Sequence, residues 1–406
     1  MKFKTIGTLF LMLLIFSMSS PAVFASDDFN SAETEEEMVD QEMSEANAVM
    51  QEEVIERARV LNVEETDGAG LEDGFYTEIL SVRLEYLSGE QKGEEFQSLH
   101  YLTGNPGYDF ELSPGDKVLV NVQEVNGETE GHIVEYVRDT YIYILLGVFV
   151  ILVVLLGGKK GVKTILTLGL TLFLLLNVLM PALLAGYSPI LVTIGISIII
   201  TVVTILFVGG NNIKSYSAII GVLGGVLIAG LIAYVVGNQT RLTGISSQEA
   251  GMLMYIPQGV TFDFSGLLFA GIIMGALGAV MDVGMSISSA MEEIRTADPS
   301  ISTKNLILAG MNVGKDIMGT MANTLILAYI GSMIPLLLLF TAYQEPFISI
   351  INMDLIATEV VRALSGSIGL ILSIPITAIT SGLLRDKAQV KTEMPVSNEV
   401  SLQMND

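Results

Sequence analysis

Long apolar segments dominate the second half of the chain. Most are about 20 residues long, which is the length that a helix needs to cross a hydrocarbon layer of about 30 Å. The expected segments are Tyr141–Leu156, Thr164–Leu184, Pro189–Val208, Ser215–Val236, Phe264–Val283, Met318–Phe340 and Val361–Leu384. This pattern predicts that residues 141–384 form a mainly α-helical bundle of about seven transmembrane helices.

An alternating pattern of apolar and polar residues occupies residues 51–138. It is clearest in residues 76–86 (YTEILSVRLEY), and turn-forming pairs such as Asn126-Gly127 separate the alternating runs. The expected strands are Val54–Val63, Tyr76–Leu87, Glu95–Tyr101, Lys117–Val125 and His132–Val137. Five short strands predict a small β-barrel-like domain, and the OB fold is one form that it could take.

Residues 1–25 have the pattern of a secretory signal peptide. Lys2 and Lys4 precede a short apolar core, and Val23 and Ala25 stand at the positions that a signal peptidase prefers. The alternative is an uncleaved first membrane helix. If the signal is used, the β domain is exported. At the other end, residues 385–406 are expected to form a cytoplasmic tail.

Residues 26–50 are acidic and poor in aromatic residues, which favours a solvated linker. Calcium binding is the alternative, but the acidic residues lack the D-x-[DN]-x-[DN]-G spacing of a calcium loop.

Composition narrows the classes of protein that this chain can be. Of its 406 residues 51% are hydrophobic and 16% are charged, and the mean hydropathy is +0.59, which excludes a soluble globular protein. The net charge is −24, and residues 26–140 carry this acidic excess with 30 acidic and 6 basic side chains, so we expect no nucleic-acid partner. The chain has no cysteine and two histidines, His100 and His132, which fit structural roles better than metal binding. We therefore expect no metal and no cofactor.

The basic residues predict how the helices are oriented. With residues 26–140 outside, the loops assigned to the cytoplasm hold most of the bases, as the positive-inside rule requires. These are Lys159, Lys160, Lys163, Lys214, Arg295, Lys304, Lys315, Arg385, Lys387 and Lys391, whereas Arg138, Arg241 and Arg362 lie near span ends outside. We expect the N-terminal domain outside and the C-terminus in the cytoplasm.

Small residues recur on single faces of the expected helices. Gly271, Gly275, Gly278 and Asp282 share one face of the fifth span, and Gly221 and Gly225 share one face of the fourth. The seventh span has Gly366, Gly369, Ser373 and Thr377 on one face. We expect the glycines to serve helix packing, and Asp282 to face neighbouring helices.

Asp282, Asp316, Thr320 and Asn323 form a candidate polar site within the membrane. All four are expected near the cytoplasmic end of the fifth and sixth spans, where Lys315 could neutralise either acid. One interpretation is a group that responds to protons or cations, because a carboxylate in a span is costly unless it is paired or protonated. The other is an interfacial Asp282 in contact with water.

No set of residues indicates catalysis. The sequence has no G-x-S-x-G elbow, and residues 309–316 (AGMNVGKD) are one residue short of a phosphate loop and place Asp316 where a hydroxyl should bind magnesium. We therefore expect that the protein is not an enzyme.

Two long strings carry a family resemblance. GALGAVMDVGMSISSAMEEI (Gly275–Ile294) and GKDIMGTMANTLILAY (Gly314–Tyr329) resemble the YibE/F family of bacterial multi-pass membrane proteins. The resemblance implies a bacterial cell membrane location, lipid as the surroundings, and a second YibE/F-like membrane protein or another copy of the chain as partner. It supplies no catalytic or binding residues.

Two functions remain open from the sequence. The first is a transport or efflux component of unknown substrate, favoured by polar and small residues within spans and by helix breaks at Pro181, Pro335 and Pro375. The alternative is a non-catalytic membrane scaffold or envelope sensor that acts in a complex with a second membrane protein.

Overall fold

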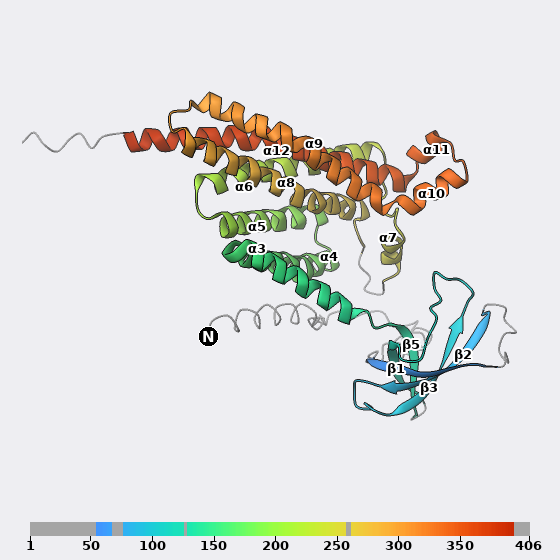
Figure 1. Ribbon diagram of the computed structural model, residues 1–406. Helices are drawn as coiled ribbons and strands as arrows, with labels where there is room; N and C mark the ends of the chain where they lie inside the picture. The colour runs from blue at the N-terminus through green and yellow to red at the C-terminus, as the bar shows by residue number, and fades with distance from the viewer. Residues whose placement is uncertain (1–53, 67–75, 126–127, 257–260, 394–406) are drawn as a thin grey trace, which may run out of the picture. The chain divides into compact units, whose positions relative to one another are not determined.

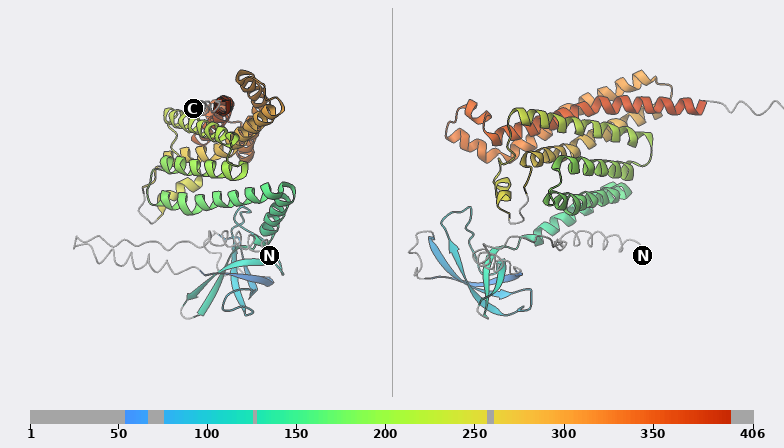
Figure 2. Two further views of the ribbon diagram at one scale, coloured as in Figure 1. Left: turned by 90° about the vertical axis from the view of Figure 1, so that its left-hand side faces the viewer. Right: turned by 180° about the vertical axis from the view of Figure 1, so that it is seen from behind.

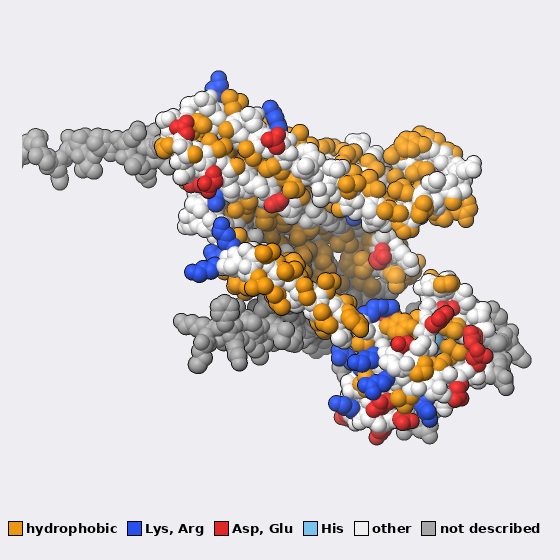
Figure 3. Space-filling model, in the orientation of Figure 1, with side chains coloured by type: hydrophobic (Ala, Val, Ile, Leu, Met, Phe, Trp, Pro, Cys, Tyr) orange, Lys and Arg blue, Asp and Glu red, His pale blue; other side chains and the backbone are white. Residues whose placement is uncertain are grey.

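A computed structural model describes residues 54–66, 76–125, 128–256 and 261–393. The chain divides into two compact units, residues 22–152 and a second unit that holds residues 153–406, and each is described by itself. The expected signal peptide and acidic linker lie outside the described residues, as does most of the expected tail. Hydrophobic side chains cover much of the visible helix surface, whereas charged side chains gather over the strands (Figure 3).

The first unit contains five antiparallel strands, as predicted (Figure 1). They are β1 (Val54–Glu65), β2 (Glu78–Tyr86), β3 (Glu95–Leu102), β4 (Lys117–Val125) and β5 (Glu128–Tyr136), in the sheet order β3-β2-β1-β4-β5. Strand β5 begins four residues before the predicted His132, because residues 128–131 continue the pairing with β4. The fold is therefore a half-barrel, in agreement with the predicted barrel-like domain.

Alternate side chains of the strands form the core of this half-barrel. Val82 and Leu84 of β2 and Val118 and Val120 of β4 are each at most 1% exposed. The edge strands β3 and β5 approach each other without pairing. Gly131 makes this approach possible, because a Cβ there would lie 2.5 Å from the Phe96 ring.

The segment between β3 and β4 covers one end of the half-barrel. The buried His100 has its Nε2 3.0 Å from the Phe110 carbonyl oxygen, so this nitrogen carries the proton and donates. Asp109 accepts hydrogen bonds from the Thr103 amide and hydroxyl at 2.8 and 2.9 Å, and these bonds lower the pKa of its carboxyl group. His100 thus has a structural contact, whereas the side chain of His132 is 56% exposed.

The second unit is helical, and one helix, α3, begins in the first unit. The longer elements are α3 (Asp139–Leu174), α5 (Pro189–Gly209), α6 (Ile213–Gln239), α8 (Phe264–Ala297), α9 (Thr303–Ser332) and α12 (Asp354–Glu393). The shorter ones are the π-helix η2 (Leu175–Leu179), α4 (Met180–Leu184), α7 (Gln248–Met252), the 3₁₀ turn η3 (Leu253–Tyr255), α10 (Ile334–Ala342) and α11 (Phe347–Ile351). The π-helix precedes Pro181, which has no N–H to complete an ordinary helical turn.

Five helical segments among the described residues are long and apolar enough to cross a membrane. A sixth results if α9 and α10, which are bent by 62° to each other, form one broken span. The first of the five, Asp139–Leu184, is interrupted at Gly158, whose φ of 53° and ψ of −129° are not helical. The break falls between two predicted spans, so the prediction of about seven crossings agrees with the structure if residues 139–184 cross twice and α9 and α10 together form one span.

Three helices continue beyond their predicted ends. α8 extends past Val283 to Ala297, because no proline interrupts residues 284–297 before Asp298-Pro299. α9 begins at Thr303, where Ser302 accepts a hydrogen bond from the Asn305 amide at 3.3 Å, so the helix starts before the predicted span at Met318. α12 likewise extends in both directions beyond the predicted Val361–Leu384.

α6 and α8 lie at the centre of the helical unit. α5 packs on one side of them, and α12 and α9 pack on the other (Figures 1 and 2). Ala218, Val222 and Ala229 of α6 and Val280 and Val283 of α8 are completely buried. Small side chains at the centre allow the helices to approach closely.

Candidate functional site

The four predicted polar residues are distributed over two helices. Asp282 lies on α8 and Asp316, Thr320 and Asn323 lie on α9, and all four are exposed. The Thr320 hydroxyl donates to the Ile317 carbonyl of its own helix at 2.9 Å. Across the described part of the chain, no hydrogen bond or ion pair joins any two of these four side chains.

The predicted packing glycines fall into two groups. A Cβ on Gly221 would lie 1.8 Å from the Thr377 hydroxyl oxygen, and a Cβ on Gly225 would lie 2.7 Å from the Gly369 carbonyl oxygen. Gly271 and Gly278, in contrast, have no neighbouring atom within 4 Å of such a Cβ. Gly221 and Gly225 therefore permit close contact between α6 and α12.

The face of α8 predicted to pack is exposed. Gly271, Gly275, Gly278 and Asp282 are all exposed, and the nearest neighbour of a Cβ on Gly275 would be the Tyr329 hydroxyl at 2.8 Å. The opposite face buries the large apolar side chains of α8, including Ile272, Ile273, Val280, Val283 and Ile287. The expectation that Asp282 points at neighbouring helices differs from the structure, because the bulky apolar face occupies the bundle interior.

A stripe of small and hydroxyl-bearing residues lines the contact between α6 and α12. It recurs every fourth residue on α12 as Ser365, Gly369, Ser373, Thr377 and Ser381, and all five are buried. Arg385 continues the same spacing by one further turn, and its side chain is 8% exposed. Its guanidinium pairs with Glu292 of α8, and its Nε donates to the Ser381 hydroxyl at 3.2 Å.

Sequence reasoning missed this end of the stripe. Ser373 and Thr377 were expected on one helix face, and Arg385 was counted only among the cytoplasmic bases. The four-residue spacing from Thr377 through Ser381 to Arg385 was the available signal. Among the described residues, no group of three acidic or histidine side chains could hold a metal ion.

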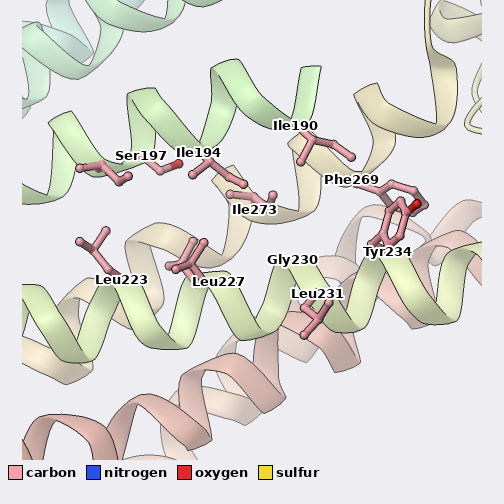
Figure 4. Close-up of a pocket in the computed structure, with 12 residues that line it drawn as sticks. Ile190, Ile194, Ser197, Leu223, Leu227, Gly230, Leu231, Tyr234, Phe269 and Ile273 are labelled. Atoms are coloured by element: carbon pink, nitrogen blue, oxygen red, sulfur yellow. The ribbon is translucent and has the colours of Figure 1, made fainter. Parts of the chain in front are cut away.

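A cleft with a volume of about 360 Å³ lies between α5 and α6, with α8 as its floor. Side chains of α5 and α6 point into it from opposite sides, and Ile273 and Phe269 of α8 lie between them (Figure 4). Its lining includes Ile190, Ile194 and Ser197 of α5 and Leu223, Leu227 and Tyr234 of α6. The lining is almost entirely apolar, and none of its side chains is charged.

Two features create this cleft. Gly230 of α6 lets α8 approach, because a Cβ there would lie 2.9 Å from Ile273. Ser197 is small, and its hydroxyl donates to the Met274 sulfur at 3.4 Å. Leu227, Leu231 and Tyr234 are 49%, 62% and 50% exposed, so the cleft opens along the outer surface of the unit, which faces lipid in a membrane. The Tyr234 hydroxyl supplies a polar group near one end of an otherwise apolar space.

Comparison with known protein families matches both parts of the chain. Residues 145–387 match the family described as YibE/F-like protein, and residues 52–136 match the YibE/F family N-terminal domain. Searches of curated proteins and of solved structures gave no match. The first match alone covers more than half of the chain, and the second coincides with the five-stranded unit. The chain therefore belongs to the YibE/F-like family of membrane proteins.

Proposed function

We propose that the protein is a membrane transport component for a small apolar or amphipathic molecule that enters from the bilayer. The observation that carries this proposal is the cleft between α5, α6 and α8. Its volume lies in the range of small-molecule sites, about 300–1,000 Å³, and its lining is apolar with few polar groups, as in such sites. In this function the protein moves its substrate and performs no chemical step.

The lining of the cleft favours one class of substrate. No charged side chain lines the cleft, and the Ser197 hydroxyl already has an acceptor in the Met274 sulfur. An inorganic ion would lose its hydration there without compensation, which is very costly in an apolar environment. An aliphatic or aromatic group would instead contact Ile194, Leu227 and Phe269, while a polar group on the same molecule could reach Tyr234.

The proposal includes an orientation in the membrane. The N-terminal β unit lies outside the cytoplasm and the C-terminus lies inside, as the distribution of lysine and arginine favours. With this orientation the Tyr234 end of the cleft lies towards the outer surface, because α6 begins after the Gly210–Asn212 turn on the cytoplasmic side and runs outward.

Flux measurements on reconstituted protein test the transport proposal. We would compare liposomes with and without the full chain, using an NBD-labelled phospholipid, tetraphenylphosphonium and sodium as probes. We expect protein-dependent movement of at least one of the first two probes and none of sodium. Leu227→Trp should reduce this movement several-fold, because the larger ring occupies the mouth of the cleft.

Ile220→Trp is the matched control. Ile220 lies on the same helix, two turns earlier, is 47% exposed against 49% for Leu227, and does not line the cleft. It should leave the flux unchanged. Absence of protein-dependent movement of both apolar probes, or equal flux in the two variants, would contradict the proposal.

The exposed α8 face supports a second candidate, a scaffold or sensor in a membrane complex. Gly271 and Gly278 have open space above them, and small residues on a transmembrane helix allow another helix to approach. The partner would be a second YibE/F-like membrane protein or another copy of this chain. Stoichiometric co-purification that Gly278→Leu abolishes, together with no flux of any probe, would favour this function.

A further inference from the structure

A nearly buried arginine, Arg385 of α12, lies beside the last turns of α8. The Arg385 side chain is 8% exposed. An arginine cannot lose its charge in a protein, so burial requires a compensating partner. Glu292 of α8 is that partner, and it is 42% exposed. In this ion pair the arginine is therefore buried in the bundle, whereas the glutamate is partly accessible to solvent.

Beneath the ion pair lies a layer of buried hydroxyl groups. The Ser381 hydroxyl accepts from the Arg385 Nε, and one turn further the Thr377 hydroxyl has no hydrogen-bond partner. On α6 the buried Ser215 hydroxyl also has no partner. Ser288 of α8 donates to the Lys214 carbonyl oxygen at 2.6 Å and so links α8 to α6.

Unpaired buried hydroxyl groups favour the entry of water. Each one has lost its contact with water on folding without gaining a hydrogen bond in return. Thr377 packs directly against the backbone of Gly221, which has no side chain. The contact between α6 and α12 is therefore tight at this position. The ion pair between Arg385 and Glu292 joins α12 to α8.

We propose that the Arg385–Glu292 ion pair is a latch that closes one end of the α6–α12 contact. Opening the latch would admit water as far as Ser381 and Thr377, whose hydroxyl groups would then be hydrated. The latch goes beyond the proposed transport function, because it concerns access to the hydroxyl stripe and not the apolar cleft.

The absence of native cysteine allows a direct test in the full chain in proteoliposomes. Thr377→Cys places a single thiol below the latch without removing a hydrogen bond, because the native hydroxyl has no partner. We would measure its rate of modification by a small cationic thiosulfonate. The rate should be low with the latch intact and should rise about tenfold or more when Glu292→Gln leaves Arg385 unpaired.

Three controls distinguish a latch from general loosening. Glu293→Gln removes a neighbouring exposed charge that forms no ion pair with the part of the chain that the structure describes, and it should not change the rate. The exchange of Glu292→Arg with Arg385→Glu should restore slow modification. Val280→Cys reports on a completely buried position of α8 and should stay unreactive in the Glu292→Gln background.

Two results would overturn the latch. One is an unchanged rate at Thr377→Cys after Glu292→Gln, and the other is an equal increase at Val280→Cys, which would mean that the bundle as a whole has loosened. The thiol rate is measured without any transported molecule. Failure of the latch therefore leaves the transport proposal standing, and absence of flux leaves the latch standing.

Discussion

Two glycines in transmembrane helices of this protein occupy opposite environments. Gly225 of α6 lies so close to α12 that a Cβ would approach the Gly369 carbonyl oxygen and the Ser373 Cβ, each at 2.7 Å. Gly278 of α8 has nothing within 4 Å of the same point. Backbone atoms cannot move aside as a flexible side chain can, so a side chain at Gly225 must separate the two helices.

We therefore expect Gly225→Val to destabilise the helical unit and Gly278→Val to have little effect. Overpacking of a close contact typically costs about 1–3 kcal/mol, and both variants carry the same penalty of helix propensity. The thermal unfolding midpoint of the purified protein in detergent should fall for Gly225→Val alone. Equal midpoints in the two variants would mean that the contact between α6 and α12 is not tight.

The sequence predicted which residues share a helix face but not which face is buried. Gly221-x-x-x-Gly225 and Gly271-x-x-x-Gly275 have the same spacing, but only the first lies against the backbone of another helix, whereas Gly271 has no neighbour within 4 Å of a Cβ and Gly275 meets the Tyr329 hydroxyl. Spacing defines a face, whereas its burial depends on the helices that assemble around it. For the same reason Arg385 could be counted as a cytoplasmic base but not recognised as a buried partner of Glu292, which is 93 positions earlier in the chain.

At the scale of elements, strands were predicted more accurately than helix ends. Each strand has a local alternation and a turn signal at its boundary, and four of the five starts lie within two residues of the prediction. The predicted spans end where apolar character stops, which does not define where a helix ends. The polar segment Ser288–Arg295 has high helix propensity and continues α8 beyond the predicted span.

The break at Gly158 leads to a prediction about α3 and its continuation. If residues 139–157 and 159–184 are separate crossings, residues 113 and 187 lie on the same side of the membrane and residue 160 lies on the other. Single cysteines at Ser113, Lys160 and Tyr187 can report this with an impermeant maleimide. We expect Ser113→Cys and Tyr187→Cys to react in intact cells and Lys160→Cys to react only after permeabilisation.

The opposite labelling pattern would contradict two crossings by residues 139–184. If residues 139–184 form one crossing, positions 113 and 187 would be labelled from opposite sides. That result would reduce the bundle to six crossings at most and would contradict the predicted orientation of all later loops.

At the scale of the whole molecule, the two units have different chemistry. The acidic excess lies in residues 26–140, and the helical unit is nearly neutral and strongly apolar. The composition and patterning of the sequence were sufficient to predict a membrane bundle and a β domain. They were not sufficient to find the cleft, because its walls come from three helices that are separate in the sequence and its shape depends on the absence of a side chain at Gly230.

The central claim is that this cleft binds a molecule with an apolar chain, and the absence of native tryptophan permits a direct measurement. Tyr234→Trp places a fluorescent ring at the cleft, and Tyr216→Trp places one near the opposite end of α6, outside it. The native side chains are 50% and 46% exposed, so both rings contact lipid to a similar extent.

With the protein in nanodiscs of ordinary lipid, dibromostearate quenches a ring that it contacts. We predict strong quenching at Tyr234→Trp that saturates with dibromostearate concentration and is removed by adding Gly230→Leu to fill the cleft. Tyr216→Trp should show only weak quenching that does not saturate. Equal, non-saturating quenching at both positions would show that the cleft is ordinary lipid-facing surface and would contradict the proposed binding site.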